Sequence, residues 1–554
     1  MRWLVCLIPF FAATIMVLGW PIAPDNDLYF HLRAGERVAS LGGPLLRDLF
    51  TYTVAGSPDE AWHSWWSQWV FWKIYSRDGF SGLRILNLIV VFVVLGAVAA
   101  FVIKRAKNVG AVLLSLTIVI LIHQHSQIIR PILFGEMCFA ITVFLLLPFD
   151  RKFSIYRLLV AVIVTGSWAN LHGSVVIMPV IFTAYAFGAW CERKEKGPDV
   201  LAYLSPGVVG LVSLCNPKGL GIYQYSLELT RLGKLAGNSE WGGMSPIFFR
   251  TSLGVPYVMT FHWDVLSLGI LLGGLGCVSF LFRGNWRKLW VSLLCVILPF
   301  VSIRHSVFLM FPVVATLCAF FSRSHNQEGR KHFLLQPGVS VLLALVLLFS
   351  YRFYQSLDVI PSIKRVSEFI ESVGLKGNVF CEPAWSNYLL FKNYPNILVA
   401  ADNRTMVNRN FFLKARDLYA DYGYDAWALM IAEAPEETDF LLISSWRDNP
   451  PYEPSDWLVI YENNHATLVI KRNDRNRSQI ERVRQYYREV GIPFDGEKDF
   501  SSRLAFQTRP KWFESQLEKM DWGKWPQEGA VEQWKRRQKQ FYESRKFFEK
   551  SPLG

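Results

Sequence analysis

The chain has 554 residues, of which 52% are hydrophobic and 15% aromatic, and its formal net charge is +13. This composition is too apolar for one large soluble enzyme, and the last third of the chain is too charged for a pure membrane bundle. We therefore predict a polytopic α-helical membrane protein with a further domain outside the membrane. Basic loops and a basic tail account for the positive charge, so the charge does not indicate nucleic-acid binding.

Apolar runs predict the membrane spans. Several are shorter than the roughly 20 residues that a straight span needs, so we expect about 11 spans, give or take one hairpin. The first run could also be a cleaved signal peptide, but its removal would reverse the parity of the later loops. The runs lie at about 3–20, 83–103, 109–122, 133–149, 155–168, 174–190, 200–215, 265–282, 289–303, 307–321 and 333–350.

Positive charges fall on alternate short loops. Lys and Arg in short loops mark the cytoplasmic side of a membrane protein. The intervening short loops carry only Arg130 and Arg304. This pattern predicts a transmembrane domain over 1–350 with its N-terminus inside, and loops 21–82 and 216–264 and the C-terminus outside. The basic residues of the predicted cytoplasmic loops are Lys104, Arg105, Lys107, Arg151, Lys152, Arg193, Lys194, Lys196, Arg283, Arg287, Lys288, Arg323, Arg330 and Lys331.

The first outer loop opens with the segment PDNDLYFHLRAGE, and a helix is predicted over 28–40 before a Gly-Gly-Pro break. If the helix includes Asp27, this residue and His31 stand at i and i+4 and share one face. A carboxylate there can accept a proton from an attacking hydroxyl or hold a metal, and the histidine can orient it. Asp25 is placed for an N-cap, and we group it with the substrate-binding candidates. Asp48 is either a second catalytic acid or part of a salt bridge in the loop.

A second helix is predicted over 58–75. Its tryptophans, Trp62, Trp65, Trp66 and Trp69, recur at i, i+3, i+4 and i+7 and form one aromatic stripe. Tryptophan prefers the headgroup region, so we expect this helix to lie flat on the outer leaflet. We prefer interfacial packing over sugar stacking as the role of the stripe.

Four further polar clusters fall at predicted outer ends of spans. Such groups are costly at membrane depth and usually mark a substrate path, with snorkelling or capping as the alternative. Arg130 and Arg304 suit a lipid phosphate because a guanidinium stays charged and makes bidentate contacts. Arg33 and His63 of the first loop join the substrate-binding candidates. The clusters are His123, Gln127 and Arg130; Asn170 and His172; Asn238, Ser239, Glu240 and Trp241; and Arg304 with His305.

Several motifs are missing from the sequence. It has no glycine-rich phosphate loop, no Cys or His spacing typical of a metal site, no Gly-x-Ser-x-Gly elbow and no charged relay in mid-span. Nucleotide-driven and secondary transport lose support for this reason. We assign no metal ligands, and leave the cofactor unknown and a divalent metal open.

An α/β domain outside the membrane is predicted over 351–472, where short helices and strands alternate. Only Cys381 falls in this domain, so no disulfide framework is expected. Residues 473–554 read as a basic helical tail that is solvated or touches the membrane surface. We expect helices at 366–373 and 387–392, and strands at 378–381, 397–401, 440–444, 458–461 and 466–471.

The order of these features resembles the GT-C superfamily of integral-membrane glycosyltransferases, and more closely its uncharacterised bacterial members. The resemblance covers residues 1 to about 410 and is carried by PDNDLYFHLRAGE, RDLFTYT, Trp62 to Gln68, IIRPILF, WANLHGS, CNPKGLGIYQY, SEW, IRHSVF, and SNYLLF followed by DNR. It implies that Asp27 is the catalytic acid of the first loop. Asp48 or Glu240 would then be a second acid, and Arg130 or Arg304 would contact phosphate.

The expected function is transfer of a sugar from a polyprenyl-phosphate carrier to an acceptor on the outer face of a bacterial cytoplasmic membrane, with inversion. The expected partners are membrane lipid and the lipid-linked donor, and no nucleic acid. One alternative is a transferase of a whole lipid-linked glycan or another group. Another is a noncatalytic component of an envelope assembly or export machine, which would bind envelope proteins.

Overall fold

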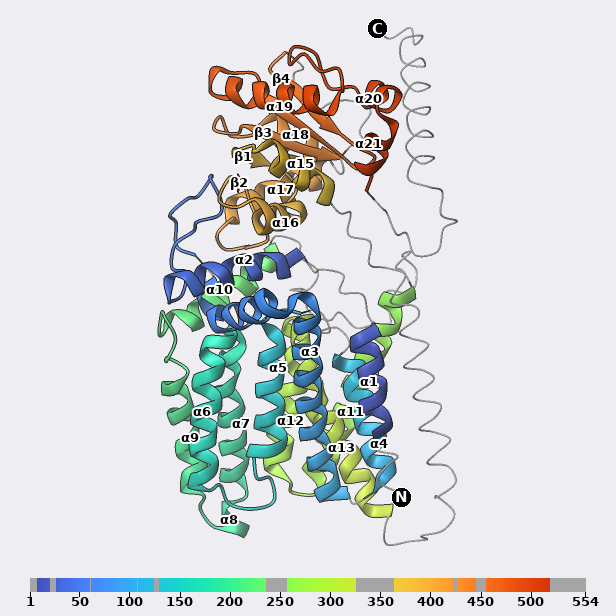
Figure 1. Cartoon of the computed structure of the whole chain (residues 1–554). Coiled ribbons are helices and arrows are strands. Elements are labelled where there is room, and N and C mark those ends of the chain that lie inside the picture. The colour runs from blue at the N-terminus through green and yellow to red at the C-terminus, as the bar shows by residue number, and fades with distance from the viewer. Residues whose placement is uncertain are drawn as a thin grey trace. The chain divides into compact units, whose positions relative to one another are not determined.

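The computed structural model (Figure 1) describes two compact units. Unit 1 comprises Met1–Ile22, Ala34–Leu45 and Ala61–Gln355, and unit 2 comprises Ala23–Arg33, Leu46–Glu60 and Ser356–Gly554. The first outer loop therefore contributes residues to both units. The residues that the structure describes are 7–19, 26–59, 61–106, 108–123, 129–235, 257–324, 363–422, 426–444 and 455–518.

Unit 1 is a bundle of apolar helices. Each predicted apolar run up to residue 321 coincides with one of these helices, and the run at 333–350 lies outside the described residues. The elements are α1 (Ile8–Gly19), the second half of α2 (Asn26–Leu41), η2 (Ala61–Ser64), α3 (Trp65–Ala106), α4 (Val109–His123), α5 (Ile132–Ala140) with η4 (Ile141–Leu146), α6 (Ile155–Leu171), η5 (Gly173–Val176), α7 (Ile177–Cys191), α8 (Arg193–Lys196), α9 (Val200–Val212), α10 (Gly221–Leu235), α11 (Tyr257–Phe282), α12 (Trp286–Val301), η8 (Ile303–Leu309) and α13 (Met310–Ser324).

Three segments of the described chain are long and apolar enough to cross a membrane: Trp62–Ala106, Gly173–Cys191 and Ile303–Ser322. Five shorter apolar helices accompany them. The structure thus confirms a helical protein with several apolar helices, and the number of spans stays a prediction.

The loops predicted to be cytoplasmic meet at one end of unit 1. Arg287, only 1% exposed, pairs there with Glu192 at 3.0 Å and Asp199 at 3.3 Å. Asp150 pairs with Lys288 at 3.0 Å. Figure 1 shows α8, which belongs to these loops, at one end of the unit and α10 at the other. A buried guanidinium is tolerated because carboxylates and backbone carbonyls surround it.

The predicted tryptophan stripe is only partly correct. The chain forms the short helix η2 and then α3, which changes direction at Gly79, where φ is 61° (Figure 1). Trp62 is 2% exposed and packs edge-on against Tyr225, and the indole of Trp65 donates to Asn170 at 2.8 Å. The two remaining tryptophans of the stripe are exposed. The stripe is split because other helices of unit 1 cover half of it.

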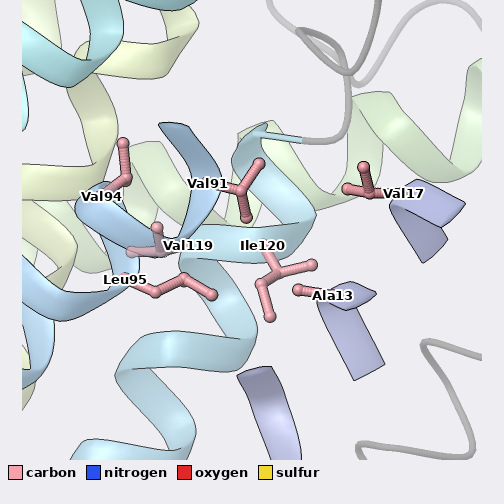
Figure 2. Close-up of a pocket in the computed structure, with 7 residues that line it drawn as sticks. All are labelled: Ala13, Val17, Val91, Val94, Leu95, Val119 and Ile120. Atoms are coloured by element: carbon pink, nitrogen blue, oxygen red, sulfur yellow. The ribbon is translucent and has the colours of Figure 1, made fainter. Parts of the chain in front are cut away.

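A small apolar pocket lies between α1, α3 and α4 in unit 1. Figure 2 shows its aliphatic lining, which consists of Ala13, Val17, Val91, Val94, Leu95, Val119 and Ile120. Its volume of about 10 Å³ is close to the space of a single water molecule. The pocket is therefore too small to hold a prenyl chain.

Unit 2 contains a five-stranded sheet with the order β2-β1-β3-β5-β4. The strands β2, β1 and β3 run parallel to one another. Strand β5 runs antiparallel to both of its neighbours, β3 and β4. All five predicted strands and both predicted helices are confirmed. The elements are α15 (Lys364–Val373), β1 (Gly377–Phe380), α16 (Pro383–Asn393), β2 (Ile397–Val399), α17 (Arg409–Tyr422), α18 (Ala426–Ala432), β3 (Phe440–Ser444), β4 (Trp457–Glu462), β5 (Ala466–Lys471), η11 (Asp474–Asn476), α19 (Arg477–Val490), α20 (Ser502–Thr508) and α21 (Pro510–Ser515).

The predicted domain boundary at residue 472 does not coincide with a boundary in the structure. Tyr487 on α19 is fully buried, donates to the carbonyl of Ile460 at 2.8 Å and stacks on Phe500. The backbone of Phe500 in turn donates to Val459 of β4. Residues 473–518 are therefore part of the α/β unit, because their apolar side chains complete its core. The rest of the predicted tail lies outside the described residues.

Part of the first outer loop pairs with the edge strand β2. The backbone of Tyr52 donates to Val399 at 3.0 Å, and Val399 donates to Phe50 at 3.2 Å. The hydroxyl of Thr53 donates to the carbonyl of Ala400 at 2.5 Å. This segment covers backbone groups of an edge strand that would otherwise be unpaired. It also brings the first loop to the carboxyl end of β2.

Candidate functional site

Asp27 lies in the first turn of α2 and is half-buried. Its Oδ1 accepts a hydrogen bond from Nδ2 of Asn403 at 2.9 Å, across 376 residues of sequence. Asn403 follows β2 at the carboxyl end of the parallel strands, the edge of such sheets where ligand sites commonly lie. The predicted catalytic acid is thus placed at a plausible edge for chemistry and has an amide partner.

Arg33 fixes the same helix to α16. Its guanidinium donates to the carbonyls of Leu390, at 3.0 Å, and Phe391. These carbonyls lie in the last turn of α16, where few backbone acceptors are paired within the helix, and the carbonyl of Leu390 also accepts from the backbone N–H of Tyr394 at 3.3 Å. Tyr29 packs edge-on against Tyr388 at 4.9 Å. Arg33 was predicted to bind substrate, and the contacts described here give it a part in holding α2.

A buried ion cluster stands beside Asn403. The guanidinium of Arg404 pairs with Asp48 at 2.5 Å, Asp59 at 2.7 Å and Asp402 at 2.6 Å, and all four residues are at most 4% exposed. Burial by itself lowers the pKa of Arg404, but the three carboxylates raise it well above its ordinary value. Arg404 therefore remains charged and joins two parts of the first loop to the segment after β2.

Asp48 occupies the second of its two predicted roles, the salt bridge. Besides Arg404, it accepts hydrogen bonds from the backbone of Phe50 and from the backbone and hydroxyl of Thr51. It is 2% exposed, so no acceptor hydroxyl can approach it in this structure. We therefore leave Asp48 out of the proposed catalytic set.

Three further candidates are His31 and Asp25 of the first loop and Glu240 of the loop 216–264. His31 is half-buried on α2, one turn after Asp27, with its ring 5.6 Å from that of Phe30. Asp25 and Glu240 lie outside the described residues. The predicted roles of these three residues stay predictions.

His172 belongs to a hydrogen-bonded network in unit 1. The backbone N–H of Ser174 donates to its Nδ1 at 3.1 Å, and the Ser174 hydroxyl lies 2.7 Å from the same nitrogen. Because Nδ1 accepts the backbone N–H of Ser174, the Ser174 hydroxyl donates to it, and the hydroxyl oxygen accepts from the indole of Trp168 at 3.1 Å. Nδ1 is thus an acceptor, and this favours the tautomer with its proton on Nε2. A Cβ on Gly135 of α5 would lie 2.7 Å from the Ser174 hydroxyl, so glycine leaves room for the network.

His63 lies next to this network. Its ring stacks on Tyr225 of α10 at 4.6 Å and is 6.2 Å from the ring of His172. The Nζ of Lys218 lies 5.1 Å from the ring centroid of Trp62. An imidazole N–H donor, an ammonium group and aromatic faces together are suited to sugar hydroxyls or phosphate. The predicted candidates His63 and His172 are therefore neighbours.

Arg130 precedes α5, and Arg304 lies in η8; both are half-buried. Nδ1 of His305 is 3.3 Å from the carbonyl of Leu298. A phosphate role for Arg130 and Arg304 stays a prediction. Among the described residues, no group of three or more His, Cys, Asp or Glu side chains is placed to hold a metal ion.

The sequence did not single out several residues of these sites, among them Asn403 and Arg404 in unit 2 and Ser174, Lys218 and Tyr225 in unit 1. The signal for Asn403 was present, because DNR follows a predicted strand that ends at residue 401. Polar residues just after a buried parallel strand are placed at the ligand edge of the sheet. Ser174 and Tyr225 lie in motifs that were noted, but the sequence did not show that these motifs meet.

No protein-family model matches the chain, and no curated protein matches it. A solved structure does match: the archaeal oligosaccharyltransferase AglB from Archaeoglobus fulgidus, in complex with an inhibitory peptide and a dolichol-phosphate. The alignment covers 80% of this chain and 69% of that chain, with a TM-score of 0.50 and 11% sequence identity. The chain shares the fold of that GT-C enzyme over the aligned residues. At this identity the likeness concerns the fold alone, and it confirms the resemblance predicted from the motif order.

On this GT-C fold the sequence motifs fall into two groups. WANLHGS, CNPKGLGIYQY and the start of α3 meet in unit 1, where Tyr225 packs on His63 and Asn170 accepts from Trp65. PDNDLYFHLRAGE, RDLFTYT and DNR meet in unit 2, through Asp27 and Asn403 and through Asp48 and Arg404. Motifs that are far apart in the sequence thus form two compact sites.

Proposed function

We propose that the protein is an inverting glycosyltransferase. It moves a sugar from a polyprenyl-phosphate carrier to an acceptor hydroxyl on the outer face of a bacterial cytoplasmic membrane. The observation that carries this proposal is the half-buried carboxylate of Asp27, held by Asn403 within a GT-C fold. Fold alone does not establish an activity, so the proposal depends on what this site can do chemically.

Asp27 acts as general base in this mechanism. Its carboxylate takes the proton of the acceptor hydroxyl while that oxygen bonds to the anomeric carbon of the sugar. The bond between the anomeric carbon and the phosphate oxygen breaks, and the electron pair leaves with the polyprenyl phosphate. Attack opposite to the leaving group inverts the anomeric centre. No nucleotide is consumed on the outer face.

Cationic and imidazole groups of unit 1 are the proposed ligands of the donor's phosphate. Arg130 and Arg304 are the arginines proposed for this task, because guanidinium makes bidentate contacts with phosphate oxygens. The Nε2–H of His172 and the ammonium of Lys218 are further donors. His31 is assigned to the orientation of Asp27.

A second candidate function is transfer of a whole lipid-linked glycan. The observation that favours it is that the matched GT-C structure is an oligosaccharyltransferase, which was solved with a peptide and a dolichol-phosphate. In both functions a polyprenyl phosphate or pyrophosphate leaves the anomeric carbon, and the functions differ in the size of the transferred group.

A comparison of donors tests the proposal. Purified protein in nanodiscs is given undecaprenyl-phosphate-glucose, an undecaprenyl-pyrophosphate-linked oligosaccharide or UDP-glucose, together with an envelope extract as acceptor. We expect release of undecaprenyl phosphate from the first donor only. Consumption of the oligosaccharide alone would favour the second candidate function. Consumption of UDP-glucose alone, or of none of the three, would contradict both.

A further inference from the structure

The segment Asp402 to Arg404 does more than provide one hydrogen bond. We propose that Asn403 is a positioning residue that orients the Asp27 carboxylate for proton transfer, and that the Arg404 ion cluster holds Asn403 in place. This inference rests on the proposed function, because it assumes that Asp27 is the base. Four sets of contacts within unit 2 support it.

The first set fixes the loop on both sides of Asn403. Asp402 accepts from the backbone N–H of Arg404 at 3.0 Å, from its Nε and from Nδ2 of Asn408 at 2.9 Å. Asn408 also donates to the carbonyls of Asp402 and Arg404. The backbone around Asn403 is therefore closed into a small hydrogen-bonded turn.

The second set ties this turn to the first outer loop. Arg404 reaches Asp48 and Asp59, which lie 356 and 345 residues earlier in the sequence. All of these groups are buried, where an ion pair is screened less than in water. A guanidinium that makes several bonds in one plane also restricts the direction of each partner. The turn therefore cannot shift without breaking buried ion pairs.

The third set ties the same guanidinium to the helix that carries Asp27. The carbon of the Arg404 guanidinium lies 4.9 Å from the ring centroid of Phe30 and 5.4 Å from that of Phe50. Phe30 is three residues after Asp27, on α2. One buried side chain thus contacts both the turn that presents Asn403 and the helix that presents Asp27.

The fourth set stops α2 from sliding. Arg33 donates to the carbonyls near the end of α16, and its guanidinium lies 5.7 Å from the ring of Tyr394. With α2 and the turn both fixed, the 2.9 Å bond from Asn403 determines how the plane of the Asp27 carboxylate is turned. A hydrogen bond to the charged form also favours the ionised carboxylate that a general base needs.

Two substitutions of Asn403 test the proposal by kcat, KM and the pH–rate profile, with undecaprenyl-phosphate-glucose as donor in nanodiscs. Asn403→Ala removes the donor, and kcat should fall about tenfold, as expected for the loss of a hydrogen bond to a charged group, while the KM for donor changes less than twofold. Asn403→Asp places a second carboxylate beside Asp27, so the acidic limb of the profile should move to higher pH by about one unit or more. Both variants should melt close to the wild type, because Asn403 is only half-buried.

Asn393→Ala is the matched control. Asn393 is a buried asparagine of the same unit that exchanges hydrogen bonds with Ser367. Its loss should lower the melting temperature and leave the pH–rate profile unchanged. The inference would be overturned if both Asn403 variants kept the wild-type kcat and pH–rate profile. It would also be overturned if their melting temperatures fell strongly while the pH–rate profile stayed unshifted. An active Asp27→Asn would instead remove the proposed function itself, so the two failures are distinguishable.

Discussion

At the residue scale, Arg404 is the side chain that joins two parts of the first loop to the segment after β2 through buried ion pairs. One guanidinium faces three buried carboxylates, from residues 48, 59 and 402. Removing one partner of a buried ion pair leaves charges without compensation, which costs more than the pair contributes in its intact form.

Arg404→Ala should therefore destabilise unit 2 by about 3–5 kcal/mol. Arg404→Lys keeps the charge but not the fork geometry, and should recover only part of this loss. The measurement is thermal or chemical unfolding in detergent. Arg477→Ala is the control, because its salt bridge with Asp474 is 84% and 92% exposed and should contribute almost nothing. Equal stability of Arg404→Ala and the control would contradict the assigned role of the cluster.

Glu518 is a second residue whose environment has a measurable consequence. Burial raises its pKa from 4.5 to about 7, although the backbone N–H of Arg365, a donor at 2.7 Å, lowers it. Between these two values the folded protein keeps a proton that the unfolded chain has lost. The stability that this residue contributes is therefore present at low pH and is lost as pH rises from about 4.5 to about 7.

Glu518→Gln should remove this loss of stability at higher pH, because the amide carries no charge and its oxygen still accepts a hydrogen bond from the backbone N–H of Arg365. We expect a melting temperature above that of the wild type at pH 8 and a small difference at pH 5. Glu514→Gln, an exposed neighbour on α21, should leave the melting temperature unchanged at both pH values. A Glu518→Gln variant that gains stability at pH 5 and not at pH 8 would reverse the predicted sign.

The sequence located Asp27 but left Asp48 open between two roles. Local spacing identified both as acids of the first loop. What separates them is Arg404, which lies 356 residues after Asp48, and no local pattern contains that information. Asn403 could have been predicted as a site residue, because polar residues after a parallel strand lie at the ligand edge of the sheet. Its hydrogen bond with Asp27 could not, because that contact forms only when the first loop folds against this edge.

At the element scale, period and turn signals placed most helices and strands. The strands at 440–444 and 466–471 have the predicted bounds, because each is a short apolar run between polar residues. The many basic residues of α19 led to the prediction of a solvated tail. The helix nevertheless buries Val483 and Tyr487 on its other face and so belongs to the core. The tryptophan stripe is split for a related reason, since α6 and α10 contact Trp65 and Trp62, and the other two tryptophans are exposed.

Gly35 provides a test of how α2 packs on α3 within unit 1. A Cβ at this position would lie 2.7 Å from the carbonyl carbon of Gln68 and 2.9 Å from Cβ of Trp72. Gly35→Ala should therefore lower the melting temperature by several degrees, because two helix backbones would have to separate. Gly96→Ala on α3 is the control: its Cβ meets nothing within 4 Å, and alanine should raise helix stability by roughly 0.5–1 kcal/mol. Equal effects of the two substitutions would contradict the close packing.

At the scale of the whole molecule, composition predicted the division into apolar helices and an α/β domain, and motif order predicted the GT-C fold. The number of spans and the share of the first loop in unit 2 were beyond the sequence. Short membrane spans and buried helices have similar lengths, so the sequence cannot separate them. Residues 50–53 cover β2 through backbone hydrogen bonds, and side-chain patterns do not predict such pairing.

Membrane orientation can be tested directly. A reporter fused after Tyr354 should function only outside the cytoplasm, and one fused at Glu195 only inside, because basic loops stay in the cytoplasm. A third fusion at Lys152, in another basic loop, should behave like the one at Glu195. The reverse result at either of the first two positions would contradict the prediction that the proposed site residues share the outer face of the membrane.

The central claim is that Asp27 is the base of a sugar transfer from a lipid phosphate, and the rate of Asp27→Asn tests it most directly. Asparagine is nearly isosteric and can still bond to Asn403, so the variant should melt with the wild type while transfer from undecaprenyl-phosphate-glucose falls by ~10²- to 10⁴-fold. Asp474→Asn, an exposed acid of the same unit, should keep full activity. An Asp27→Asn protein with wild-type turnover would contradict the claim, and one that unfolds would show that the carboxylate is structural.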